Sequence, residues 1–220
     1  HDLNANLYAI VKLPFGFEYQ MNFTPRYHWY EYMNHESAEH PEWAGDGGRS
    51  ERKNEKTFNW QVDNILRWKK EFGEDHRVEA TFLQNAEKGQ WWKTVAQNKL
   101  YSPSDILGFH NIGAGTAPSV SSEDTYKTGD ALMGRLFYSF KDKYMLTASV
   151  RRDGYSAFGS MNPHAVFPAV ALGWVFTSEK FMEKTSDWLN YGKLRFSWGQ
   201  NGNRDIGQYE ALAQLNSGAY

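Results

Sequence analysis

The feature that most constrains this chain is an alternation of apolar and polar residues near its beginning. Apolar side chains occupy every odd position from Leu7 to Phe23. A period of two places successive side chains on opposite faces of an extended chain, so the pattern predicts β-strands. Pro14 and Gly16 interrupt the run and predict a tight turn between a strand that begins at Leu7 and a second strand over about 16–30. Strands in soluble proteins rarely exceed ten residues, so a strand of this length restricts the possible folds.

The same alternation recurs along the rest of the chain. Each further segment sets apolar residues against polar or small ones, and turn residues separate the members of a pair. With the first two, these segments make about eight strands and predict an all-β, antiparallel protein. The further strands are expected at 58–69, 77–82, 132–140, 144–151, 166–176 and 193–199.

The connections between these strands are of two kinds, and the two kinds alternate. Long loops are uncommon in compact domains unless they carry function. Short turns at one end of the strands and long loops at the other are typical of outer-membrane β-barrels. Short turns are expected near 14, 73 and 142, a moderate connection at 177–191, and long loops at Met33–Asn54, Ala86–Thr128 and Asp153–Ala165.

Strand length and aromatic placement favour a transmembrane barrel segment over a soluble sandwich. A membrane-spanning strand needs about 9–11 residues, which the segment at 16–30 supplies. Aromatic residues such as Trp68 and Phe72 beside one turn, and Tyr30 at the far end of a strand, match the girdles of such barrels. We therefore expect apolar faces toward lipid and polar faces toward the lumen. The residues expected to face the lumen are Glu18, Arg26, Asp63, Arg67, Arg135 and Arg195.

Two other interpretations remain open. In a soluble carbohydrate-binding β-sandwich, Trp43, Trp91 and Trp92 on the long loops would form a platform for sugars. In the barrel interpretation the same three residues are candidates for contact with substrate or a lid. A complete eight-stranded barrel would require the two ends of this chain to pair. Several residues depart from the alternation, which a bulge or register shift would explain, namely Asn64, Gln84, Tyr8, Ile10, Leu83 and Phe137.

Composition excludes several classes of protein. A net charge of −2 and a pI near 6.4 give no basic field, so we expect no nucleic-acid partner. The absence of cysteine excludes a disulfide scaffold and any cysteine-based metal or redox site. Mean hydropathy is −0.71, and no apolar run is long enough for a spanning helix. The chain begins without Met and ends without a closing element, so we expect a piece of a longer protein.

Catalytic and cofactor motifs have no convincing match in this sequence. His35 and His40 are five positions apart, which fits neither arrangement of a zinc-protease helix. The segment GAGTAP at 113–118 begins like a dinucleotide loop but lacks the third glycine. We therefore expect no catalytic residue, no cofactor and no metal site, and we expect that the protein is not an enzyme.

The second half of the chain resembles a known family. The segments are GRLFYSFKDKYMLTASV at 134–150, RRDGYSAFG at 151–159, FPAVALGW at 167–174, SEKFM at 178–182 and KLRFSWGQNGN at 193–203. In this order and spacing they resemble the barrel of SusC/RagA-type TonB-dependent outer-membrane transporters of Bacteroidota. YSPSDILG at 101–108 is similar to an extracellular loop of the same family. The match departs at Tyr155, Ala157 and Val175.

This resemblance carries its own expectations. It implies that residues 1–220 are part of a receptor barrel of about 22 strands, without the plug domain, the TonB-contact segment and the closing strands. It implies uptake of oligosaccharides or peptides across the outer membrane of a Gram-negative bacterium. The implied partners are a SusD-like surface lipoprotein and the TonB–ExbB–ExbD complex, which would act through segments outside this chain.

Overall fold

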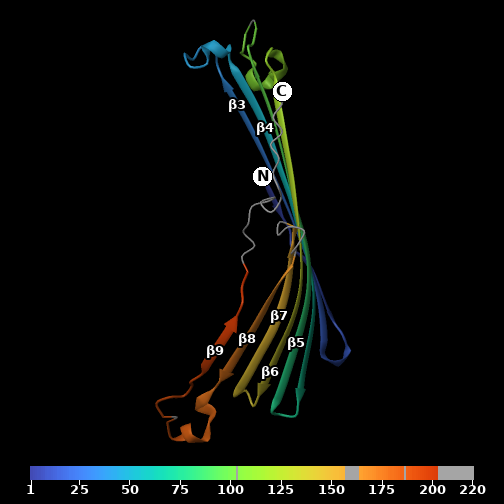
Figure 1. Ribbon diagram of the computed structural model, residues 1–220, viewed down its shortest axis with the longest axis vertical. Helices are drawn as coiled ribbons and strands as arrows, with labels where there is room; N and C mark the ends of the chain where they lie inside the picture. Colours follow the sequence, from blue (N-terminus) through green and yellow to red (C-terminus); the bar gives the residue numbers. More distant parts are fainter. Residues whose placement is uncertain (103, 157–163, 186, 203–220) are drawn as a thin grey trace. The chain divides into compact units, whose positions relative to one another are not determined.

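The computed structural model describes residues 1–102, 104–156, 164–185 and 187–202 (Figure 1). Its described residues form one nine-stranded sheet in the order β1-β3-β4-β5-β6-β7-β8-β9, with β2 also paired to β3. The strands are β1 (Asp2–Asn4), β2 (Leu7–Lys12), β3 (Phe17–Glu36), β4 (Arg49–Phe72), β5 (His76–Lys99), β6 (Ser119–Phe140), β7 (Tyr144–Tyr155), β8 (His164–Trp174) and β9 (Leu194–Gly199). The all-β prediction is confirmed.

The chain divides into two compact units. Unit 1 contains His1–Ala5, Thr24–Trp60 and Lys88–Tyr126, and therefore the first expected long loop and most of the second, whereas the third falls in unit 2. Unit 2 contains Asn6–Phe23, Gln61–Glu87 and Lys127–Tyr220, and therefore the short turns. Strands β3 to β6 contribute residues to both units.

The expected short turns are confirmed. A 3-10 turn at Pro14–Gly16 joins β2 to β3, with φ of 63° at Phe15 and 83° at Gly16. A side chain at Gly16 would also collide with the carbonyl oxygen of Lys69, so both conformation and space require glycine there. The hairpin of β6 and β7 pairs Phe140 with Tyr144.

The expected long loops are shorter than the sequence indicates. Strand β3 continues to Glu36 and β4 begins at Arg49, while β5 continues to Lys99 and β6 begins at Ser119. Strands β7 and β8 likewise include both ends of the segment expected as the third long loop, of which residues 157–163 lie outside the described residues. Backbone hydrogen bonds form a strand whether or not apolar and polar residues alternate. A strand that is polar on both faces therefore cannot be recognised from the alternation of apolar residues.

The sheet has an exposed apolar face in place of a core between two layers. Among the described residues, the buried apolar ones are Tyr101, Ala131, Tyr155 and Val175. Leu136 is 48% exposed and Leu172 is 52% exposed, although both belong to the apolar face. No second sheet covers them in the described part of the chain, which removes the support for a sandwich. The described strands also leave β1 and β9 at opposite ends of the strand order, so they do not close an eight-stranded barrel.

The break between β1 and β2 has a local cause. Asn4 pairs with Arg26, and the ladder resumes where Leu7 pairs with Phe23. Pro25 lies between these two positions on β3 and has no N–H to donate, so one ladder hydrogen bond is lost there. Its carbonyl oxygen still accepts the N–H of Ala5 at 3.1 Å.

Candidate functional site

The polar face of β3, β4 and β5 in unit 2 carries a network of paired side chains. Arg67 on β4 donates through Nη1 to Oε1 of Glu18 at 3.1 Å and to Oε1 of Gln20 at 2.7 Å, both on β3. Alternation places Glu18 and Gln20 on one face, so a single guanidinium reaches both. Two of the residues expected to face the lumen therefore contact each other directly.

Asp63 extends this face toward β5. Its Oδ1 accepts a hydrogen bond from Nδ2 of Asn85 at 2.7 Å, and Gln61 donates to both carboxylate oxygens at 3.1 and 3.0 Å. Closer to the turn between β4 and β5, Glu79 pairs with Lys69 and with Arg77 at 3.6 Å each. On this part of the face, ion pairs therefore partner Glu79, and amide hydrogen bonds satisfy the Asp63 carboxylate.

The other expected lumen residues have different surroundings. Arg135 on β6 and Arg195 on β9 are exposed, and no ion pair holds either one within the described ranges. Each lies opposite a small residue, Ser149 for Arg135 and Gly173 for Arg195, which leaves the guanidinium groups accessible. Arg26 belongs to unit 1 and pairs with Asp2 at 3.7 Å.

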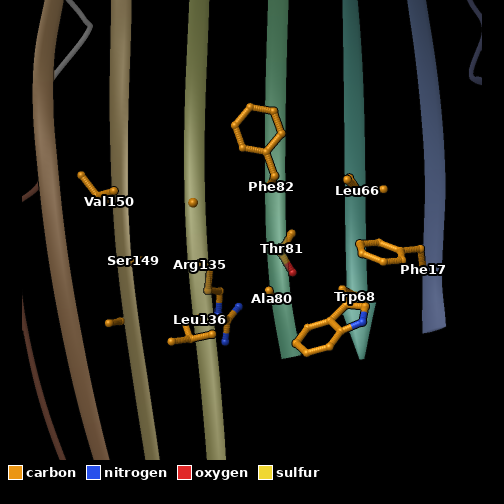
Figure 2. A pocket seen from close by; sticks show the side chains of 12 residues that line it. Phe17, Leu66, Trp68, Ala80, Thr81, Phe82, Arg135, Leu136, Ser149 and Val150 are labelled. Carbon is orange, nitrogen blue, oxygen red and sulfur yellow. The ribbon is translucent and has the colours of Figure 1, made fainter. Parts of the chain in front are cut away.

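The apolar face of unit 2 contains a hollow of about 530 Å³ (Figure 2). Gly134, Ala80 and Ala148 contribute small residues to its lining, and a side chain at Gly134 would meet no atom within 4 Å. Phe82 and Trp68 are among the large side chains around it. The face is thus apolar but uneven.

Five of the six departures from alternation do not come from register shifts, namely Asn64, Gln84, Phe137, Tyr8 and Ile10. Tyr19, Asn64 and Gln84 lie on the apolar face and bind one another: the Tyr19 hydroxyl donates to Asn64 Oδ1 at 2.5 Å, and Asn64 Nδ2 donates to Gln84 Oε1 at 2.7 Å. Each polar group is thereby partly satisfied in an apolar setting. On the polar face, the guanidinium of Arg77 lies 5.3 Å from the ring centre of Phe137, which accounts for an aromatic residue there. Tyr8 pairs with Asn22 and Ile10 pairs with Gln20 in a regular ladder, so both lie on the polar face without a shift of register.

The three tryptophans do not form one platform. Trp43 lies in the connection between β3 and β4, as expected, and the guanidinium of Arg49 lies 5.6 Å from its ring centre. The expectation that Trp91 and Trp92 lie on a loop is wrong, because both are within β5. As neighbours in a strand they face opposite ways, and Trp91 shares the face of Asn85. Contact of the three with substrate or a lid stays a prediction.

Sequence reasoning missed a cluster in unit 1 that joins the connections. His35, near the end of β3, lies 2.9 Å from Ser50 Oγ through Nδ1 and 3.4 Å from Asp105 Oδ2 through Nε2. The N–H of Ala38 donates to Asp105 Oδ2 at 2.7 Å, and this bond lowers the pKa of the Asp105 carboxyl. Ser50 is 0% exposed, so a substrate cannot reach its hydroxyl. The arrangement fastens the 37–48 connection to the 100–118 connection and is here called the loop latch.

A second missed cluster, in unit 2, centres on Glu179. Lys143 Nζ lies 2.6 Å from Glu179 Oε2, Trp174 Nε1 donates to Oε1 at 3.0 Å, and the Tyr144 hydroxyl donates to the same oxygen. These donors, Lys143 foremost, lower the pKa of Glu179 to about 2. The group is here called the Glu179 clamp. The sequence contained the aromatic and basic residues but no signal that they converge on one carboxylate.

Metal-ligating side chains do not gather in the part of the chain that the structure describes. Among those residues, no three His, Asp or Glu side chains are grouped closely enough to hold a metal ion. Over the same described ranges, no helix is long and apolar enough to cross a membrane.

Comparison with known proteins identifies relatives by sequence. The family model described as TonB dependent receptor-like, beta-barrel, matches residues 2–218. TonB-dependent receptor P39 of Formosa agariphila is 33% identical over 165 residues, which are 74% of this chain and 16% of that protein. TonB-dependent receptor SusC of Bacteroides thetaiotaomicron is 33% identical over 132 residues, which are 59% of this chain and 12% of that protein. The chain thus spans less than a fifth of the length of these relatives.

Comparison with solved structures agrees on the fold. The structure of the RagAB peptide transporter matches with a TM-score of 0.89 at 21% identity, over 100% of this chain and 24% of that one. A structure of the RagAB peptide importer in its "open-open" state gives 0.87 at 20% identity over the same shares. With the family match over residues 2–218, these findings show that the chain belongs to the TonB-dependent receptor β-barrel family, as a barrel segment of the SusC/RagA type.

Proposed function

We propose that the full-length protein imports nutrient oligomers, either oligosaccharides or peptides, across the outer membrane of a Bacteroidota bacterium. In this proposal residues 1–220 form part of the barrel wall. The work done is gated translocation, with no covalent bond made or broken by these residues. The plug, the segment that contacts TonB and the closing strands would lie in other parts of the protein.

The observation that carries the proposal is the contrast between the two faces of the sheet in unit 2. One face holds bonded polar groups such as Arg67 with Glu18. The other exposes Leu136, Leu172 and Phe196 at 48%, 52% and 64%. A surface this apolar is unfavourable in water, whereas hydrocarbon chains would cover it without cost. The polar face would line a wet lumen, where charged groups keep their hydration.

The proposal assigns roles to the candidate residues. Four paired groups would line the lumen, namely Glu18, Arg26, Asp63 and Arg67. Because they already have partners, they would keep the wall polar and bind a charged substrate only weakly. Arg135 and Arg195 lack such partners in the described part of the chain, so they would meet the plug or an anionic group of the substrate. Trp43, Trp91 and Trp92 would contact substrate or lid, and the alternation along β5 supports a position of Trp91 on the proposed lumen face.

The proposed partners follow from the family. A SusD-like lipoprotein would cover the end of the barrel that carries the connections of unit 1, and the loop latch would hold those connections in place beneath it. Energy would come from TonB–ExbB–ExbD through segments outside this chain. The structural neighbour RagAB is a peptide transporter. At 21% identity that likeness concerns the fold alone, so both substrate classes are kept as arms of the test.

The experiment measures uptake by cells that carry the full-length protein with its neighbouring lipoprotein. Fluorescent oligosaccharides and fluorescent peptides are supplied separately, with TonB present or deleted. We expect TonB-dependent uptake of one class. Uptake of both classes that is unchanged when either the transporter gene or TonB is deleted would overturn the proposal.

A matched pair of variants links that uptake to the assigned faces. Arg135→Glu reverses a charge on the proposed lumen face, and Lys180→Glu reverses one on the exposed connection after β8. The proposal expects a larger loss of uptake from the first than from the second at equal amounts of protein in the outer membrane.

A further inference from the structure

The connection between β8 and β9 presents large aromatic side chains to solvent. Phe181 is 66% exposed, Trp188 75% and Tyr191 65%. The lysines Lys180 and Lys184 on the same connection are also exposed. A soluble surface seldom gathers three aromatic side chains this exposed within eleven residues, so the segment marks an interaction site.

The Glu179 clamp shows which side of the sheet this connection lies on. Tyr144 and Trp174 belong to the apolar face, because they alternate with Met145 and Gly173 on the polar face. Both rings point their polar atoms at the Glu179 carboxylate. The beginning of the connection is therefore fastened beside the end of the apolar face and away from the polar face.

The connection is also closed upon itself. The N–H of Gly192 donates to Thr177 Oγ1 at 3.0 Å, and the ring of Phe176 occupies the space that a side chain at Gly192 would need. The backbone N–H of Val175 donates to the carbonyl of Lys143 at 2.8 Å. The contacts of Gly192 hold the two ends of the connection together, and the bond of Val175 ties its beginning to the turn between β6 and β7, so its aromatic residues have a defined support.

The apolar face continues directly from this clamp. A hollow of about 800 Å³ lies beside it. Its residues come from β6 to β9, and most of them belong to the apolar face. Lipid that covers the apolar face would therefore also reach the connection at the Glu179 clamp. The residues that line it are Tyr138, Tyr144, Met145, Leu146, Leu172, Gly173, Trp174, Leu194, Arg195 and Phe196.

We propose that the connection between β8 and β9, in its described residues 175–185 and 187–193, is an interfacial anchor that binds the phospholipid leaflet at the boundary between headgroups and acyl chains. Aromatic side chains with a polar tip favour that boundary, and lysines there extend their amines to the headgroups. The inference rests on the proposed membrane function. Lys180 and Lys184 are balanced by Glu183 and Asp187, so attraction depends on the aromatic side chains more than on net charge.

The experiment places a nitroxide on single cysteines in the full-length transporter, in nanodiscs of phosphatidylethanolamine and phosphatidylglycerol. Asn190→Cys lies between Trp188 and Tyr191 and leaves both rings intact. Leu172→Cys marks the apolar face, and Glu74→Cys marks the exposed short turn between β4 and β5. Relaxation by oxygen, which concentrates in lipid, is compared with relaxation by a water-soluble nickel complex.

We expect the ratio of oxygen to nickel accessibility at Asn190 to be shifted from the value at Glu74 toward that at Leu172. Glu179→Gln and Trp188→Ala, each introduced beside the Asn190 label, should return the ratio toward the value at Glu74. If Asn190 matches Glu74 while Leu172 reports lipid, the anchor is refuted and the proposed function stands. If Leu172 also reports water, the proposed membrane function itself is refuted.

Discussion

The assignment of the two faces is tested most severely by one charge placed on each. Leu136 is the centre of the apolar run Leu132–Phe140, and its side chain is 48% exposed. Thr147 lies on the polar face, where it pairs with Phe137 and Ala171. Leu136→Arg and Thr147→Arg therefore introduce the same group into neighbouring strands on opposite sides of the sheet.

The expected difference follows from depth in the membrane. Leu136 lies four positions from either end of its run. At about 3.3 Å per residue and a tilt of about 40°, it lies about 10 Å inside either edge of the apolar band. Arginine near the midplane of the lipid face costs about 2–4 kcal/mol, so Leu136→Arg should destabilise the folded barrel by that amount. Thr147→Arg keeps its charge in a wet lumen and should cost less than about 1 kcal/mol.

The assay measures the free energy of folding of the full-length protein into phospholipid vesicles by denaturant titration, followed by tryptophan fluorescence. A loss confined to Leu136→Arg supports the assignment. Equal losses for the two variants, or a larger loss for Thr147→Arg, would refute the reasoning from which lipid and lumen faces were assigned.

Three other outcomes are expected. A double-mutant cycle of Arg67→Ala and Glu18→Ala should give a coupling of about 0.2–1 kcal/mol, because both side chains are partly exposed; zero coupling would show that the contact adds nothing. Asp105→Asn should speed proteolysis of the 37–48 connection, and identical cleavage of variant and wild type at neutral pH would contradict the latch. Because the pKa of Asp105 is lowered in the folded protein, its contribution to the stability of the latch is complete above its ordinary pKa and is lost as pH falls. The wild type should therefore be cleaved about as fast as the variant in acid. Gly48→Ala should have a similar effect, because φ is +80° and the new Cβ would lie 2.7 Å from Asp105 Oδ2; unchanged cleavage would count against the geometry.

The sequence predicted those parts of the fold in which alternation has a physical cause. Where one face is apolar and the other polar, as in the hairpin of β6 and β7, strand position and turn agree with the structure. Beyond such segments the strands continue with polar residues on both faces. Gln97 on β5 donates to Glu51 on β4 at 2.5 Å, a cross-strand pair that no periodicity of hydropathy reveals.

Site residues were predictable one at a time, and their partners were not. Glu18 and Arg67 were both assigned to the polar face from their place in the alternation. The alternation within one strand does not show that Arg67 on β4 contacts Glu18 on β3. Asn64 and Gln84 suggested a bulge because their polarity conflicts with their phase. The hydrogen bonds among Tyr19, Asn64 and Gln84 resolve that conflict without any change of register.

The clusters that sequence reasoning missed join segments far apart in the chain. Asp105 reaches Ala38 across 67 positions, and Lys143 reaches Glu179 across the whole of β7 and β8. Each needs the sheet to be formed before its members become neighbours. Aromatic and charged residues near turns are common enough that their presence alone did not indicate these contacts.

The central claim is that one face of this sheet meets lipid and the other meets water. Single cysteines at each position from Met145 to Val150 of β7, in the full-length protein in intact cells, test it most directly with a water-soluble maleimide. Reaction should alternate, with Met145, Thr147 and Ser149 labelled and Leu146, Ala148 and Val150 protected. Uniform reaction along the strand, or alternation in the opposite phase, would contradict the claim.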